Sequence, residues 1–155
     1  MSLFNLVLSV LVIGATFFVF GQRAAAGQQA TGTIKLHSRS HYHGMWAALT
    51  STLPALLILL VIVLGKGLLF QHWASHFFPP EVAGGDAVDR AIALAKITNV
   101  VDGIKFGEVE PWVQSAGEAW TRWESDTVIV ANILVLGVSL TGGLLGYRRI
   151  SFKFR

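Results

Sequence analysis

The 155-residue chain contains no cysteine and few charged residues. Without thiols, disulfides, thiolate metal sites and cysteine nucleophiles are excluded. Asp, Glu, Lys and Arg make up only 14% of the residues and 53% are hydrophobic, a balance that a water-soluble domain of this size does not normally show. Phosphate-binding glycine loops, His-Glu metalloprotease motifs and Ser/His/Asp patterns are also lacking, so we do not expect an enzyme.

Charge is missing altogether from three apolar windows, residues 3–20, 45–65 and 127–147. At a rise of about 1.5 Å per residue, each window forms a helix roughly 27–31 Å long, which matches the hydrocarbon core of a bilayer. A helix also satisfies its own backbone hydrogen bonds in lipid. The sequence therefore predicts an all-α integral membrane protein with three transmembrane helices.

Acidic residues are absent outside residues 71–126, and this asymmetry predicts the orientation. All nine Asp and Glu residues lie in that segment, together with four basic residues, whereas residues 21–44 and 148–155 are basic and contain no acid. Basic segments remain on the cytoplasmic side of a membrane. We therefore expect the N-terminus outside, the C-terminus inside and the acidic segment outside.

The windows and the charges together predict six segments. These are a first span (residues 1–21), a cytoplasmic basic loop (22–44), a second span (45–66), an exterior helical segment with amphipathic helices (67–126), a third span (127–147) and a cytoplasmic basic tail (148–155). Lys66 departs from the charge pattern, but its flexible stem lets the ammonium reach the interface.

A signal peptide is the alternative for the first span, since an Ala-Ala-Ala run follows Arg23. Signal peptides carry their positive charge before the apolar stretch, so we favour a span.

A strip of basic and aromatic residues precedes the second span. It contains His37, Arg39, His41, Tyr42, His43 and Trp46. His37 and His41 are four residues apart and share a helix face, so with His43 they are candidates for a metal site. A fourth ligand and an orienting carboxylate are lacking nearby. We favour an interface with phospholipid headgroups or with a partner subunit.

Pro54 interrupts the second span. Proline removes one helical hydrogen bond and collides with the carbonyl four residues earlier, that of Thr50, so we expect a bend there. The hydroxyls of residues 50–52 are placed to satisfy the freed backbone. Such a bend shapes helix packing or acts as a hinge.

The third span carries polar and small residues. Asn132 requires a hydrogen-bond partner on another helix or at the outer interface. Toward the inner end, Ser139 and Gly143, and likewise Gly142 and Gly146, are spaced as small-xxx-small pairs. This spacing lets a second helix approach closely, and we interpret it as a packing face and a candidate partner contact.

The exterior segment is predicted to be helical. Gly84-Gly85-Asp86 reads as a turn and an N-cap for an amphipathic helix over residues 86–106, with an i,i+4 ion pair between Asp86 and Arg90. Its apolar positions recur at helical spacing and are Leu94, Ile97, Val101 and Ile104. A second helix is expected over residues 110–126.

Three tryptophans lie along this second exterior helix. They are Trp112, Trp120 and Trp123. Tryptophans beside the entry of a span are typical of an interfacial belt, in which the indole sits between water and lipid. Anchoring of a ligand is the alternative.

Two runs of the sequence resemble a known family. Residues 35–65, KLHSRSHYHGMWAALTSTLPALLILLVIVLG, and residues 147–155, YRRISFKFR, are similar to the N-terminal extension on long forms of PstC, the permease subunit of the bacterial phosphate-specific ABC importer. In that family a His-Ser, then Tyr or His-Gly, an aromatic residue and Leu-Pro-Ala open a hydrophobic span. The corresponding residues here are His37-Ser38, Tyr42-His43-Gly44, Trp46 and Leu53-Pro54-Ala55.

The resemblance implies a multi-pass protein of the bacterial inner membrane, with a periplasmic N-terminus and a cytoplasmic C-terminus. Its partners would be a second permease subunit, an ATPase and a periplasmic phosphate-binding protein. In the family, a basic stretch like residues 148–155 leads into a six-span permease core. This sequence ends at Arg155, so no residue of that core is carried over.

Two functional hypotheses follow. In the first, the chain is the membrane-embedded N-terminal part of a phosphate-import permease, with a structural or assembly role and no catalysis of its own. In the second, it is a free-standing three-span accessory subunit that binds and stabilises another inner-membrane complex. We expect no cofactor. We also expect no nucleic-acid partner, because the basic residues flank the spans and form no interleaved basic-aromatic surface.

Overall fold

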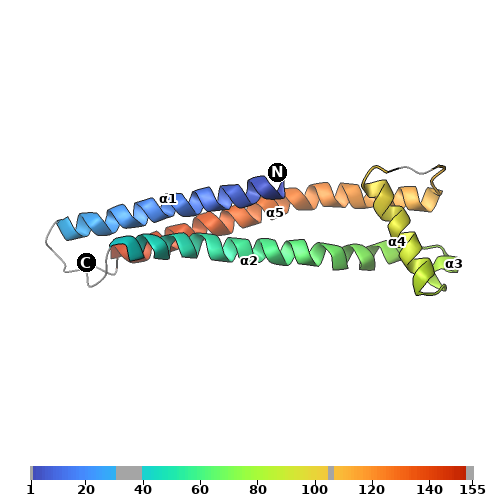
Figure 1. Ribbon diagram of the computed structural model, residues 1–155, viewed down its shortest axis with the longest axis horizontal. Helices are drawn as coiled ribbons and strands as arrows, with labels where there is room; N and C mark the ends of the chain where they lie inside the picture. Colours follow the sequence, from blue (N-terminus) through green and yellow to red (C-terminus); the bar gives the residue numbers. More distant parts are fainter. Residues whose placement is uncertain (1, 31–39, 105–106, 153–155) are drawn as a thin grey trace. The chain divides into compact units, whose positions relative to one another are not determined.

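The computed structural model describes residues 2–30, 40–104 and 107–152, and these are almost entirely helical, with no strand among them. The elements are α1 (Leu3–Ala30), α2 (Ser40–Ala74), the 3-10 helix η1 (Ser75–Phe77), α3 (Pro80–Ala83), α4 (Ala87–Val101) and α5 (Pro111–Phe152) (Figure 1). Within the described residues, α1, α2 and α5 are long and apolar enough to cross a membrane. The predicted fold class is thereby confirmed.

The three long helices continue beyond the apolar windows. The predicted basic loop over residues 22–44 begins within a helix, because α1 remains helical to Ala30 and alanine has the highest helix propensity. The predicted exterior helix over residues 110–126 and the third span form one helix, α5. Neither glycine nor proline separates these two parts, so nothing in the local sequence ends the helix between them.

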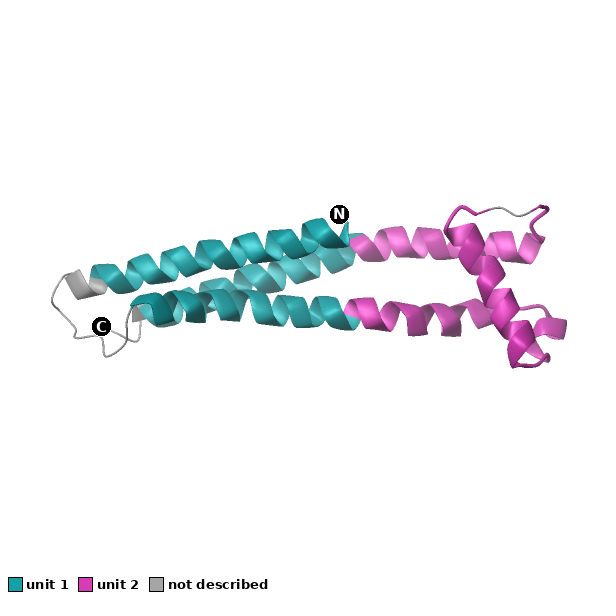
Figure 2. Ribbon diagram, viewed as in Figure 1, with its two compact units in different colours: residues 1–61, 129–155 teal, residues 62–128 magenta. Residues whose placement is uncertain are grey.

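The chain divides into two compact units, and each is described by itself (Figure 2). Unit 1 comprises residues 1–61 and 129–155, and unit 2 comprises residues 62–128. Unit 1 therefore holds α1 with one part each of α2 and α5. All nine acidic residues of the protein belong to unit 2.

Unit 1 is a three-helix bundle in which each helix presents a narrow stripe of buried residues. The stripes are Leu6, Val10, Gly14, Phe17, Gly21 and Ala25 on α1, Gly44, Ala47, Ser51, Ala55 and Leu59 on α2, and Val135, Ser139, Gly143, Gly146 and Ile150 on α5. Successive members are three or four residues apart, as in left-handed helix bundles. Most members are small, so the helix backbones lie close together.

Unit 2 packs around a core of larger residues. Ala74, Ile97, Val113 and Ala116 are buried, and aromatic side chains from α2, η1 and α5 cover them. The predicted apolar stripe of α4 is confirmed at Ile97, which is fully buried, and at its partly buried neighbours Leu94 and Val101.

The ends of α4 follow from its sequence. A capping box closes its start, since the Asp86 carboxylate accepts hydrogen bonds from the amides of Val88 at 2.8 Å and Asp89 at 2.9 Å. The predicted Asp86–Arg90 ion pair is wrong, because the cap engages this carboxylate and the Arg90 guanidinium donates to the backbone oxygen of Asp86 at 3.3 Å. We expected the helix to reach residue 106.

The helix ends at Val101 because Gly103 adopts a positive φ of 75°. The amide of Gly103 then donates to the Val100 carbonyl at 3.1 Å, and that of Ile104 donates to the Asn99 carbonyl at 2.7 Å. These two bonds form the Schellman arrangement that stops a helix. Ile104 consequently lies outside α4 and is 45% exposed.

Candidate functional site

The basic and aromatic strip lies at the start of α2, in unit 1. Tyr42 is 64% exposed and Trp46 is 47% exposed, and the ring of His41 contacts that of Phe18 with centroids 5.2 Å apart. His43 is partly buried. His37 and Arg39 lie outside the described residues. The described aromatic members are thus placed on the surface, where lipid or a partner reaches them, and this role for the strip stays a prediction.

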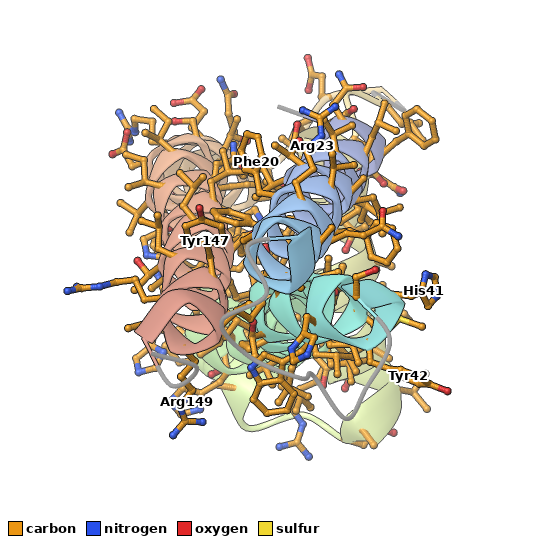
Figure 3. All side chains as sticks on the ribbon, turned by 90° about the vertical axis from the view of Figure 1, so that its left-hand side faces the viewer. Phe20, Arg23, His41, Tyr42, Tyr147 and Arg149 are labelled. Atoms are coloured by element: carbon orange, nitrogen blue, oxygen red, sulfur yellow. The ribbon has the colours of Figure 1, made fainter. Side chains whose placement is uncertain are left out.

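Cationic side chains gather at the same end of unit 1. The C-terminal parts of α1 and α5 meet the start of α2 there, because Ala25, Ala47 and Ile150 share one buried cluster. Arg23 on α1 and Arg149 on α5 are exposed near these helix ends (Figure 3). The C-terminus of a helix carries partial negative charge, and Arg149 lies in the last turn of α5, so its positive charge is stabilised there. Unit 1 contains no acidic residue, and its charged end is therefore purely basic.

Gly142 and Gly146 contact α2 of the same chain. A Cβ added at Gly142 would collide with the Thr50 backbone oxygen. At Gly146 it would collide with the Thr50 hydroxyl and lie 3.1 Å from the Cα of Ala47. The predicted packing face is therefore an intramolecular seam between α5 and α2, and its glycines are used within unit 1.

α2 continues as a helix through Pro54. The hydroxyls before this proline do not satisfy the Thr50 carbonyl that it frees, contrary to our expectation. Thr50 donates to the carbonyls of Trp46 at 3.0 Å and Ala47 at 3.1 Å, and Thr52 donates to that of Ala48 at 2.9 Å. Hydroxyls in a helix reach carbonyls three or four residues earlier, and not their own.

One hydroxyl pair joins α2 to α5 inside the bundle. Ser51 and Ser139 are both fully buried. The Ser51 hydroxyl donates to the Ser139 backbone oxygen at 2.9 Å, and the two hydroxyl oxygens are 3.1 Å apart. Sequence reasoning assigned the Ser51 hydroxyl to the backbone freed by Pro54 and missed its contact with α5, although its spacing from Ala47 and Ala55, four residues on each side, was the available signal. Asn132 is partly buried, and its side-chain amide makes no hydrogen bond to any described residue.

The tryptophans of α5 pack within unit 2. Trp120 is only 3% exposed, and its ring lies 4.7 Å from that of Phe70, 5.3 Å from that of Trp73 and 4.8 Å from that of Trp123. Trp112 contacts Phe78 at 6.2 Å. The expected belt at the lipid surface therefore does not describe Trp120, because this indole fills the aromatic centre of unit 2. Trp123, at 40% exposure, remains on the surface.

Lys66, the base that departs from the charge pattern, forms an ion pair with Glu124. This pair links α2 to α5 within unit 2. A second ion pair joins Lys96 on α4 to Glu110 at 2.7 Å. Lys66 thus has an acidic partner on the neighbouring helix, which sequence spacing alone did not reveal because the two residues lie far apart in the chain. No group of three or more His, Cys, Asp or Glu residues suited to a metal ion occurs in the described part of the chain.

The helices and their packing define a class, that of all-α membrane proteins with three candidate spans. The model of the phosphate ATP-binding cassette transporter family matches residues 7–141, which is most of the chain. The protein belongs to this family, as the sequence resemblance predicted. Transporters of this class work as complexes of membrane subunits with an ATPase. No curated protein and no solved structure matches the chain.

Proposed function

We propose that the chain is the membrane-embedded N-terminal part of a phosphate-import permease and that it serves the assembly of the transporter, without catalysis of its own. The family match over residues 7–141 carries this proposal. In its cellular setting the chain would lie in the bacterial inner membrane. It would contact the second permease subunit and, through the assembled complex, the ATPase.

The filled interior of unit 1 supports an assembly role. A Cβ at Gly143 would collide with the ring of Phe17, and one at Gly14 would collide with the Thr52 side chain. Backbone and side chains therefore occupy the space between the three helices. A transport pathway with a substrate site needs polar groups around a cavity, and the small-residue seams of unit 1 provide close packing instead.

The outer faces of unit 1 support contact with lipid and other membrane subunits. Large apolar side chains such as Leu53, Leu57 and Ile133 are 58%, 63% and 68% exposed. α5 also carries a shallow apolar groove beside Gly137, where an added Cβ would meet no atom within 4 Å apart from the adjacent backbone of its own helix. Exposed apolar surface of this extent requires lipid or a protein partner around it.

Co-purification tests the assignment. The tagged chain is solubilised from its own cells in mild detergent, and the retained proteins are identified by mass spectrometry. We expect the second permease subunit and the ATPase in amounts comparable to the bait. Their absence from the complex would overturn the importer assignment, and stable retention of a different membrane complex would support the accessory-subunit alternative.

The proposed orientation has a separate test, made simple by the absence of native cysteine. Single cysteines replace Ser38, in the basic loop, and Ser115, which is exposed on α5. An impermeant thiol reagent applied to intact spheroplasts should label the cysteine at position 115 and leave that at position 38 unlabelled. Permeabilised cells provide the control, because both positions should then react. The opposite pattern in intact spheroplasts would reverse the proposed topology.

A further inference from the structure

Two histidines of unit 2 lie together where α2 ends and η1 begins. His72 occupies the last turn of α2, and His76 lies in η1. Both side chains are exposed. Their rings meet edge to face with centroids 5.3 Å apart. Neither histidine contributes to the buried core of the unit. Their four-residue spacing on consecutive helical turns brings the two exposed rings together.

A backbone carbonyl selects the tautomer of the neutral His76 ring. Its Nδ1 lies 3.1 Å from the backbone oxygen of His72. A carbonyl oxygen only accepts hydrogen bonds, so Nδ1 must carry the proton and donate it. The remaining nitrogen, Nε2, then presents its lone pair outward. Histidines that bind metals commonly show this arrangement, in which one nitrogen donates to a backbone carbonyl and the other is the ligand.

The separation of the rings is compatible with a chelate. A metal bound about 2.0–2.1 Å from two imidazole nitrogens in tetrahedral geometry sits about 3.2 Å from each ring centre, which puts the two centres about 5.2 Å apart. The observed 5.3 Å is close to this value. The rings meet edge to face, so chelation requires the exposed ring of His72 to rotate until one of its nitrogens and Nε2 of His76 converge on a common ion.

We propose that His72 and His76 form a two-imidazole binding site for a divalent transition-metal ion, of the class of Cu²⁺, Ni²⁺ and Zn²⁺. Imidazole suits these ions, whereas Mg²⁺ and Ca²⁺ prefer oxygen ligands. Because no third His, Cys, Asp or Glu completes a cluster among the described residues, water fills the remaining positions. Affinity then follows the general order for divalent ions, with Cu²⁺ tightest. The site is independent of the transporter assignment.

The test uses the detergent-purified full chain with a histidine-free tag, in a background in which His37, His41 and His43 are replaced by alanine. This background leaves His72 and His76 as the only histidines of the chain. Zn²⁺ is titrated by calorimetry, and Cu²⁺ is followed by electron paramagnetic resonance. We expect one ion per chain and a Cu²⁺ spectrum with two equivalent nitrogen ligands. His72→Ala and His76→Ala should each weaken binding at least tenfold.

A matched control keeps the number of histidines and changes only their spacing. The double variant Gln71→His/His72→Ala places the two rings five residues apart and on different sides of the helix, so it should bind as weakly as the single alanine variants. Circular dichroism confirms that each variant keeps its helix content. Equal affinity of this control and the parent, or a Cu²⁺ spectrum with a single nitrogen ligand, would overturn the site.

Discussion

In unit 1 the helices meet along glycine, alanine and serine, whereas in unit 2 tryptophan and phenylalanine fill the space between them. Lipid is as apolar as a leucine side chain, so burying large side chains between spans gains little free energy. Close approach of the helix backbones, together with hydrogen bonds, holds the spans together instead. Unit 2 carries all nine acids, which require water, and in water the burial of large apolar rings drives packing. We propose that the two kinds of core reflect two solvents, lipid around unit 1 and water around unit 2.

Removing the central indole of unit 2 should have the largest effect. Trp120→Ala deletes a ring that contacts three other aromatic residues, and we expect a loss of roughly 3–5 kcal/mol in the free energy of unfolding of unit 2. Tryptophan fluorescence during denaturant titration in detergent micelles measures this loss. Trp123→Ala is the control, because that side chain is 40% exposed. Equal losses in both variants would show that unit 2 has no aromatic core of the kind described.

Unit 2 should be destabilised by the removal of atoms, whereas the seam between α5 and α2 in unit 1 should be destabilised by the addition of atoms. Gly142→Ala forces a methyl group against the Thr50 backbone oxygen, and we expect a destabilisation of about 1–3 kcal/mol. Gly137→Ala on the same helix meets open space and should be neutral or stabilising by up to about 1 kcal/mol, because alanine favours helix over glycine. Thermal unfolding followed by circular dichroism compares the two. A neutral Gly142→Ala would contradict the close approach of α5 and α2.

The capping box at the start of α4 should also contribute to the stability of unit 2. Asp86→Ala removes the acceptor of the Val88 and Asp89 amides, so unit 2 should lose about 1 kcal/mol. Asp86→Asn keeps an acceptor and removes the charge, and it should retain most of that stability. Hydrogen exchange at the first turn of α4 measures both. Similar loss in the two variants would assign the effect to charge and not to the cap.

The smallest expected effect lies in the Ser51–Ser139 pair. A double-mutant cycle with Ser51→Ala and Ser139→Ala should give a coupling of about 0.6 kcal/mol, the average for hydrogen bonds between membrane helices. Unfolding in mixed micelles with increasing detergent denaturant measures each corner of the cycle. A coupling near zero would show that the two hydroxyls do not interact, and it would leave the bond from Ser51 to the Ser139 backbone oxygen, which Ser139→Ala does not remove, as the hydrogen bond between these helices.

The sequence was sufficient to predict the spans, the turn at Gly84-Gly85 and the cap at Asp86, because each depends on local composition or on one short motif. It also singled out Gly142 and Gly146 as a packing face. The opposing residue, Thr50, was not predictable as their partner, since periodicity identifies a face but not what covers it.

The same limit explains the remaining differences. The burial of Trp120 depends on Phe70 and Trp73 of another helix. The sequence around an aromatic residue beside a span has the same pattern whether the ring faces lipid or a neighbouring helix. The pairing of Lys66 with Glu124 likewise joins residues that only the tertiary fold brings together. The end of α4 was predicted wrongly for a local reason. Gly103 is a helix stop signal, but Ile104 continues the apolar spacing of the helix, and the prediction followed that spacing.

The meeting of Gly142 with the Thr50 carbonyl fixes the register of α5 along α2. Sliding α5 by one turn would bring Val138 to the place of Gly142, or Ile150 to the place of Gly146, and neither place has room for a side chain. Piston-like motion between these two helices is therefore blocked. A displacement of either helix along its axis must therefore carry the other helix with it.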